Sequence, residues 1–164
     1  RATGSLEGDL PPAPGAVNRP GQFVNVRLDG LFLRRPISAC DMDEAAGRLT
    51  LVYKVVGEGT AQMRDMVPGQ TLDLLTGLGN GYNLSVSGEH PLLLGGGVGV
   101  PPLYGLAKRL LAAGRQVTAV LGFHTAADPP GRCASSLSRS CRSIPCRHRN
   151  RIPCGLQSCT LPVL

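Results

Sequence analysis

The segment HPLLLGGGVGVPPLYGLAKRLLAAGRQVTAVLGF, residues 90–123, has the pattern of a strand, a glycine-rich loop, a helix and a second strand. Residues 92–94 form a continuous apolar run, as in a strand that is buried on both faces. Pro101 and Pro102 suit the first turn of a helix, and Gly114 suits its end. The segment therefore predicts one βαβ unit, the opening of a doubly wound parallel sheet.

The predicted helix carries apolar residues at helical spacing, with Lys108 and Arg109 facing away from them. These apolar positions are Leu103, Leu106, Ala107, Leu110 and Leu111. The glycines of residues 95–99 would let the backbone approach a phosphate at the helix start. A tight turn without a ligand is the alternative. The second strand ends in GFHT, where a standard Rossmann fingerprint would have an acidic residue, so that fingerprint is not supported.

Upstream of this unit the pattern changes to short strands separated by turn signals. QFVNVRL, LFLRRPIS and RLTLVYKVV read as strands, and TAQMRDMV reads as a short helix with Thr60 at its start. PGQTLDLLTGLGNGY reads as a turn, a strand and a glycine-rich loop. Residues 20–88 therefore predict a small antiparallel β-barrel, and residues 1–19 predict a loop or frayed N-terminus.

Two motifs in the predicted barrel suit an anionic ligand. In RRPIS, residues 34–38, an arginine fork matches a pyrophosphate and Ser38 adds a neutral donor; a solvated strand end is the alternative. In VYKVVGEGT, residues 52–60, Tyr53 could stack on a ring or ribose. Gly59 and Thr60 would present free backbone N–H groups at a helix start. An ordinary strand followed by a capped helix is the alternative there.

The charge of the chain is confined to its last part. The 164 residues carry a formal net charge of +6, yet residues 1–128 hold as many acidic as basic side chains. Residues 129–164 hold six arginines and no acidic residue. The neutral part contains a single cysteine, Cys40, which fits a reducing compartment better than a disulfide framework. The most apolar run, residues 91–107, is interrupted by five glycines and is too broken for a membrane helix.

Taken together, PGQFVNV, LRRPIS, LVYKVVGEGT, GLGNGY and LLLGGGVGVPPLYGLAKRL resemble a known family. They occur in this order and at this spacing in the electron-transfer subunits of bacterial dihydroorotate dehydrogenase, which are ferredoxin-reductase-like flavoproteins. The resemblance covers about residues 20–128. It implies an FAD-binding barrel over residues 20–88 and an incomplete NAD-binding unit over residues 89–128.

The resemblance also implies site residues and chemistry. Electrons would pass from NADH through FAD, and in the family through a [2Fe-2S] cluster, to the FMN of a catalytic dihydroorotate dehydrogenase subunit in pyrimidine biosynthesis. The protein would be a cytoplasmic part of a hetero-oligomeric oxidoreductase, with no nucleic acid or membrane partner; whether it is an enzyme by itself is left open. FAD would contact Arg35, Pro36, Ile37, Ser38, Val52, Tyr53, Lys54, Gly59 and Thr60, and NADH would face Gly95, Gly97, Gly99 and Val100.

The cysteines of residues 129–164 do not match the cluster that the family would bring. Cys133, Cys141, Cys146, Cys154 and Cys159 contain no C-x2-C pair, so neither a plant-type [2Fe-2S] site nor a zinc site is predicted. This stretch has no helical or strand period and is predicted to be irregular or disordered. We expect it to be translated out of frame after about Asp128, leaving the second strand with an unpaired edge.

Three further residues have ordinary structural interpretations. His124 follows a strand end and reads as a loop histidine, Cys40 as a small core residue, and His90 as part of a linker. Two alternative functions stay open at this point. One is another flavin reductase of the same superfamily, such as a hydrogenase-associated electron carrier. The other is a basic module in which the arginine- and cysteine-rich stretch binds nucleic acid or zinc.

Overall fold

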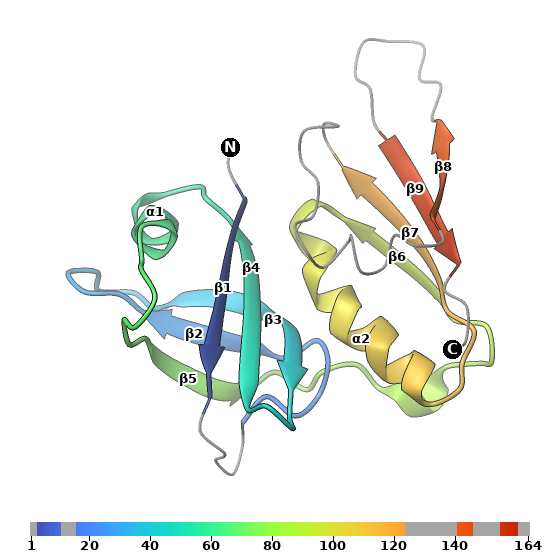
Figure 1. Ribbon diagram of the computed structural model, residues 1–164, viewed down its shortest axis with the longest axis horizontal. Helices are drawn as coiled ribbons and strands as arrows, with labels where there is room; N and C mark the ends of the chain where they lie inside the picture. The colour runs from blue at the N-terminus through green and yellow to red at the C-terminus, as the bar shows by residue number, and fades with distance from the viewer. Residues whose placement is uncertain (1–2, 11–15, 124–140, 146–154, 161–164) are drawn as a thin grey trace. The chain divides into compact units, whose positions relative to one another are not determined.

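The computed structural model describes residues 3–10, 16–123, 141–145 and 155–160 (Figure 1). The chain forms two compact units, Arg1–Tyr82 and Asn83–Leu164. Each unit has a hydrophobic core of its own. The division follows Tyr82, a few residues before the boundary expected at residue 88, because the glycine-rich loop that ends in Tyr82 packs back on the first unit through the hydrogen bond from Tyr82 N to Pro20 O.

The first unit is a five-stranded antiparallel sheet, in agreement with the expected antiparallel architecture (Figure 1). The strands are β1 (Thr3–Asp9), β2 (Phe23–Arg27), β3 (Arg35–Asp43), β4 (Arg48–Lys54) and β5 (Asp73–Leu78), in the order β1-β4-β3-β2-β5. Alternate side chains of β2, Val24 and Val26, are fully buried because strand residues alternate between the two faces. In the part of the chain that the structure describes, no ladder joins β1 to β5.

Two strand boundaries differ from the sequence prediction. Residues 1–19 were expected to be loop, yet β1 pairs with β4 from Thr3↔Lys54 to Asp9↔Arg48. Glycine and proline in this stretch suggested a loop, but an antiparallel ladder to an edge strand depends on backbone groups that every residue except proline supplies. The two arginines of RRPIS were expected at the end of a strand. In the structure, Arg35 is instead the first residue of β3, and Arg34 directly precedes the strand.

The short helix of the first unit, α1 (Glu58–Arg64), begins before the expected start at Thr60. The Thr60 hydroxyl oxygen accepts hydrogen bonds from the backbone N–H of Val56 at 2.9 Å and of Gly57 at 3.2 Å. Thr60 therefore caps the helix from its third position, by reaching back, rather than from the position before the first turn. Gly57 takes that earlier position in an extended conformation.

The second unit contains the expected βαβ arrangement. Its elements are η1 (Leu84–Val86), β6 (Leu92–Gly96), η2 (Gly97–Gly99), α2 (Pro101–Ala112) and β7 (Thr118–Phe123). Strands β6 and β7 are parallel, and α2 lies against the sheet (Figure 1). The predicted apolar face of α2 is confirmed, since Leu103, Leu106, Ala107 and Leu110 are buried while Lys108 and Arg109 are exposed.

The end of α2 also follows the prediction. Gly114 has a φ of 76°, a left-handed conformation that glycine adopts without steric cost. Its N–H donates to Leu111 O at 2.9 Å, and the N–H of Arg115 donates to Leu110 O at 3.0 Å. This pair of bonds is the Schellman pattern, which satisfies carbonyls left open at a helix end.

Two strands lie in the stretch that was expected to be irregular. Strand β9 (Gly155–Thr160) pairs antiparallel with β7, and β8 (Cys141–Pro145) pairs antiparallel with β9. The edge of β7 that was expected to stay open is therefore paired. The sequence of these strands has no alternation of apolar side chains that would predict them. The ladder is made by backbone N–H and C=O groups along the edge of β7, which have no partner until another strand pairs with them.

The two faces of β6 are not equally covered. Leu93 is 8% exposed and packs in the core with α2, whereas Leu92 and Leu94 are 58% and 67% exposed. The apolar run predicted a strand that is buried on both faces, but only one face of β6 is buried. Among the described residues, no helix combines the length and hydrophobicity that crossing a bilayer requires.

Candidate functional site

The best-defined candidate site lies where the first residue of β3 meets the first turn of α1. Gly59 is buried there, and a Cβ added to it would lie 2.6 Å from Arg35 Nε. The same Cβ would lie 3.1 Å from Leu28 Cδ1 and 3.2 Å from Leu31 Cδ1. A real Cβ essentially never lies 2.6 Å from another heavy atom, so the absence of a side chain at residue 59 is what lets the arginine cross the helix start.

The chemistry of this meeting point suits a phosphate group. The guanidinium of Arg35 is held at the loop before β3, where Nη1 donates a hydrogen bond to Leu33 O at 2.5 Å. The N–H groups in the first turn of a helix have no carbonyl one turn earlier to bond. A permanent cation beside such amides favours an anion with several acceptor oxygens. Arg35 and the first turn of α1 are therefore candidate phosphate contacts, while the position that a Cβ of residue 59 would take is already filled by Arg35, Leu28 and Leu31.

The predicted flavin-contacting residues of β3 divide between the two faces of the sheet. Pairing of Val26 with Arg35 and of Val24 with Ile37 directs these side chains toward the core face. Pro36 and Ser38 face the other way and are exposed. The structure thus places an exposed, uncharged strip of β3 directly beside the arginine, although the two belong to opposite faces.

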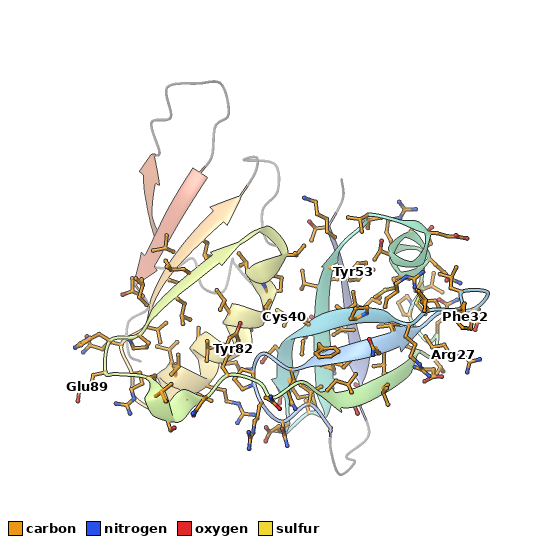
Figure 2. All side chains as sticks on the ribbon, turned by 180° about the vertical axis from the view of Figure 1, so that it is seen from behind. Arg27, Phe32, Cys40, Tyr53, Tyr82 and Glu89 are labelled. Carbon is orange, nitrogen blue, oxygen red and sulfur yellow. The ribbon has the colours of Figure 1, made fainter. Side chains whose placement is uncertain are left out.

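The predicted second wall on β4 is divided in the same way. Tyr53 is 4% exposed and belongs to the core cluster of the first unit (Figure 2). Val52, the preceding strand residue, faces the other side of the sheet and is also buried, at 9% exposed. The Tyr53 ring packs against Gly4 of β1, where a Cβ would lie 2.7 Å from the ring carbon Cζ. The expected stacking of the Tyr53 ring on a ligand is therefore not the arrangement seen. Lys54 is half-buried at the end of the strand.

Burial also sets the acidity of this tyrosine. It raises the pKa of Tyr53, since the phenolate would lose its hydration in the core; the positive charge of Arg64 opposes the shift and the negative charge of Asp65 adds to it. The hydroxyl group of Tyr53 therefore stays protonated around neutral pH.

A second candidate site is the loop between β6 and α2. Gly95 must be glycine for packing, because a Cβ there would lie 2.6 Å from Leu103 Cδ1. Gly97 has a φ of 52° and Gly99 has open space around it; both are exposed, whereas Val100 is 1% exposed in the core. This loop follows the carboxyl end of a parallel strand, where open α/β sheets bind ligands.

The residues given no site role keep ordinary surroundings where they are described. Cys40 is 1% exposed, His90 is exposed before β6, and His124 lies outside the described residues. No group of three or more histidine, cysteine or acidic side chains in the described part of the chain could hold a metal ion.

The sequence did not identify what surrounds Arg35. Leu28 and Leu31, which close the space beneath Gly59, lie in a segment that showed only strand periodicity. Arg34, the other arginine of the RRPIS motif, binds Asp73 on β5, through Nη1 to Oδ1 at 3.0 Å and Nη2 to Oδ2 at 3.1 Å. A partner 39 residues away leaves no local signal in the sequence.

Comparison with known proteins gives a consistent set of relatives, although no family model matches the chain. The chain is 48% identical to the electron transfer subunit of dihydroorotate dehydrogenase B (NAD(+)) of Geobacillus sp. strain WCH70, over 66% of this chain and 44% of that protein. The protein of the same name from Bacillus caldolyticus is 47% identical, over 68% of this chain and 45% of its own length. The chain thus spans a little under half the length of these relatives.

Solved structures give the same fold. The NADH-dependent reduced ferredoxin-NADP oxidoreductase, described for flavin-based electron bifurcation, matches with a TM-score of 0.61 and 40% identity, over 66% of this chain and 40% of that chain. Phthalate dioxygenase reductase matches with a TM-score of 0.62 over 82% of this chain and 43% of that chain. Its 20% identity supports the fold alone. The antiparallel sheet followed by a βαβ unit is therefore a fold of known electron-transfer reductases.

Proposed function

Because the chain is homologous, over about two thirds of its own length, to the electron transfer subunits of dihydroorotate dehydrogenase B, we propose that it binds FAD and transfers electrons from NADH. The chain spans less than half the length of these relatives, so the activity of the whole protein is a proposal for this chain. The proposed partner is the FMN-containing catalytic subunit of dihydroorotate dehydrogenase. The proposed location is the cytoplasm.

The observation that carries this proposal is the close approach of Arg35 to Gly59. It brings a cation from β3 against the first turn of α1, which is possible because residue 59 has no side chain. Arg35, Gly59 and Thr60 would hold the pyrophosphate of FAD. Thr60 serves indirectly, since its hydroxyl group is engaged with Val56 N and Gly57 N and thereby fixes the first turn.

The flavin ring would lie against the outward face of β3 and β4. Pro36 and Ser38 are exposed on that face, whereas Val52, on the same face of β4, is buried and would lie beneath the surface that they form. A flat apolar strip with one hydroxyl group suits a ring system that is apolar over its face and polar at its edge. Ile37, Tyr53 and Lys54 would contribute through their backbone or by supporting this surface from the core side.

The loop of Gly95, Gly97, Gly99 and Val100 would face NADH. Its exposed glycines allow close approach of a ligand to the backbone, and Val100 anchors the loop in the core. Bound FAD would supply the chemistry of accepting a hydride from NADH and releasing the electrons one at a time. The residues of this chain would bind and orient the two dinucleotides, because the cofactors themselves supply the redox chemistry.

The experiment that tests the proposal is an FAD titration of the purified full chain, followed by flavin fluorescence. Arg35→Gln removes the cation while keeping an amide of similar reach, and about tenfold weaker binding is expected from the loss of a charge-assisted hydrogen bond. Arg48→Gln is the matched control, since it removes an exposed arginine that forms an ion pair with Asp9 and has no proposed FAD contact. Failure of the unaltered chain to bind FAD would contradict the proposal.

A further inference from the structure

The two neighbouring arginines of RRPIS have different hydrogen-bond partners, which points to different roles for their side chains. Arg34 makes four hydrogen bonds, all to the first sheet. Besides the bidentate pair with the Asp73 carboxylate, Nη1 lies 3.3 Å from Asn25 O and 3.3 Å from Asp73 O. The guanidinium thus ties the start of β3 to β2 and to β5 across it.

Strand register explains why Asp73 is needed at this point. Arg27 is opposite Asp73 in the β2–β5 ladder, and Val26 is opposite Arg35 in the β2–β3 ladder. Arg34 therefore enters the sheet beside Arg27, and two like charges on neighbouring strands repel. Arg27 Nη1 lies 3.6 Å from Asp73 Oδ2, so one carboxylate serves both arginines and draws Arg34 toward β5. Figure 2 shows Arg27 and Phe32 at this end of the sheet.

The side chain of the next residue, Arg35, points in the opposite direction. Successive strand residues point to opposite faces, so holding the backbone and side chain of Arg34 also sets the direction of Arg35. The Arg35 guanidinium binds Leu33 O on the other side of Arg34, and Nε lies over Gly59. Both contacts of Arg35 depend on the backbone at residue 34.

We propose that Arg34, anchored by Asp73, is a positioning residue that aims Arg35 at the helix start, so that Arg35 alone of the pair meets an anionic dinucleotide. The inference rests on the proposed FAD function and adds the residue that organises its site. Lysine at position 34 would keep the charge but could not form the bidentate fork. A lysine at position 34 therefore distinguishes a role of Arg34 in positioning Arg35 from a role of its positive charge in attracting an anion.

The test is a double-mutant cycle on FAD affinity in the full chain, with Arg34→Gln, Arg35→Gln and the combined variant. Arg34→Gln alone is expected to weaken FAD binding by about tenfold. In the Arg35→Gln background the same change is expected to have almost no effect, since a residue that acts through another loses its influence when that other is removed. Arg34→Lys is expected to bind as weakly as Arg34→Gln.

A second measurement needs no cofactor. In the nitrogen–proton NMR spectrum of the unliganded chain, the Nε–H signal of Arg35 reports its surroundings over Gly59. Arg34→Gln and Asp73→Asn are both expected to move this signal. Arg48→Gln, which removes another exposed cross-strand ion pair, is expected to leave it in place. Asp73→Asn also supplies the cycle with a variant in which Arg34 itself is intact, should Arg34→Gln fail to fold.

The outcomes distinguish the two proposals. If the unaltered chain binds no FAD, the proposed function and the positioning role are both overturned. If it binds FAD and Arg34→Gln binds equally well, or if Arg34→Lys restores affinity, only the positioning role is overturned. An equal loss of affinity from Arg34→Gln in both backgrounds also overturns it, since Arg34 would then act independently of Arg35.

Discussion

At the residue scale, the candidate site depends on the absence of a side chain at Gly59. Arg35, Leu28 and Leu31 all approach the position that a Cβ would occupy at residue 59. The sequence predicted FAD contacts at Arg35, Gly59 and Thr60 through motif and resemblance. It allowed Tyr53 a stacking role, but the ring is buried against Gly4, because the alternation of β4 places residues 49, 51 and 53 on the core face.

Gly59→Ala should weaken FAD binding by about tenfold, because the added methyl group displaces the flexible Arg35 side chain from the helix start. The free energy of unfolding should fall by only about 1 kcal/mol, since the arginine can move aside. Isothermal titration with FAD and urea unfolding would measure the two effects. Gly57→Ala is the matched control, because a Cβ at Gly57 meets nothing within 4 Å. Equal affinity losses in both variants would contradict the role of Gly59.

The ion pairs of Asp73 predict a pH dependence. The hydrogen bonds from Arg34, more than the nearby charges, hold the pKa of Asp73 below its ordinary value, and exposure to water partly screens the effect. A lowered pKa in the folded state means that Asp73 stabilises the fold above its unfolded pKa of about 3.9 and loses this contribution as pH falls through the folded pKa. Urea unfolding of the unaltered chain and of Asp73→Asn should differ at pH 7 and converge at acid pH.

At the element scale, most of the second unit follows from local patterns. The helical spacing of the leucines, the prolines at the start and Gly114 at the end set the length and the buried face of α2. Strands β8 and β9 and strand β1 were missed. Each is a strand through pairing with a distant neighbour, and backbone pairing of this kind has no fixed periodicity in the sequence.

Gly95→Ala tests the packing of β6 on α2. The added Cβ would lie 2.6 Å from Leu103 Cδ1 in the core, and overpacking of this kind should lower the free energy of unfolding by about 1–3 kcal/mol. Gly99→Ala, four residues later in open space, should change it by less than about 0.5 kcal/mol. Urea unfolding followed by circular dichroism would compare them. A smaller effect at Gly95 than at Gly99 would rule out close strand–helix packing.

At the scale of the whole molecule, the chain consists of two units with separate cores. The first is built around Val24, Val26 and Met63, and the second around Val117 and Leu121. The proposed FAD contacts belong to the first unit and the proposed NADH loop to the second. The two proposed binding activities therefore rest on different cores and can be lost separately.

FAD should protect the first unit selectively. A ligand that binds only the folded state stabilises it by about 2.7 kcal/mol at a hundredfold excess over its dissociation constant. Hydrogen exchange measured by mass spectrometry should slow in residues 23–78 when FAD is added, and should change little in residues 92–123. Leu93→Ala, which opens the second core, should leave FAD affinity intact. Equal protection of both segments would contradict independent sites.

The sequence by itself determined the buried faces of β2 and α2, the turn at Gly114 and the order of the antiparallel and βαβ parts. These features repeat over a few residues, and strand and helix geometry converts such periods directly into a buried side. Only the tertiary structure decided that Arg34 binds Asp73 while Arg35 crosses Gly59, and that Tyr53 lies in the core. Those outcomes depend on strand order and register, which bring together residues that are far apart in the chain and share no local pattern.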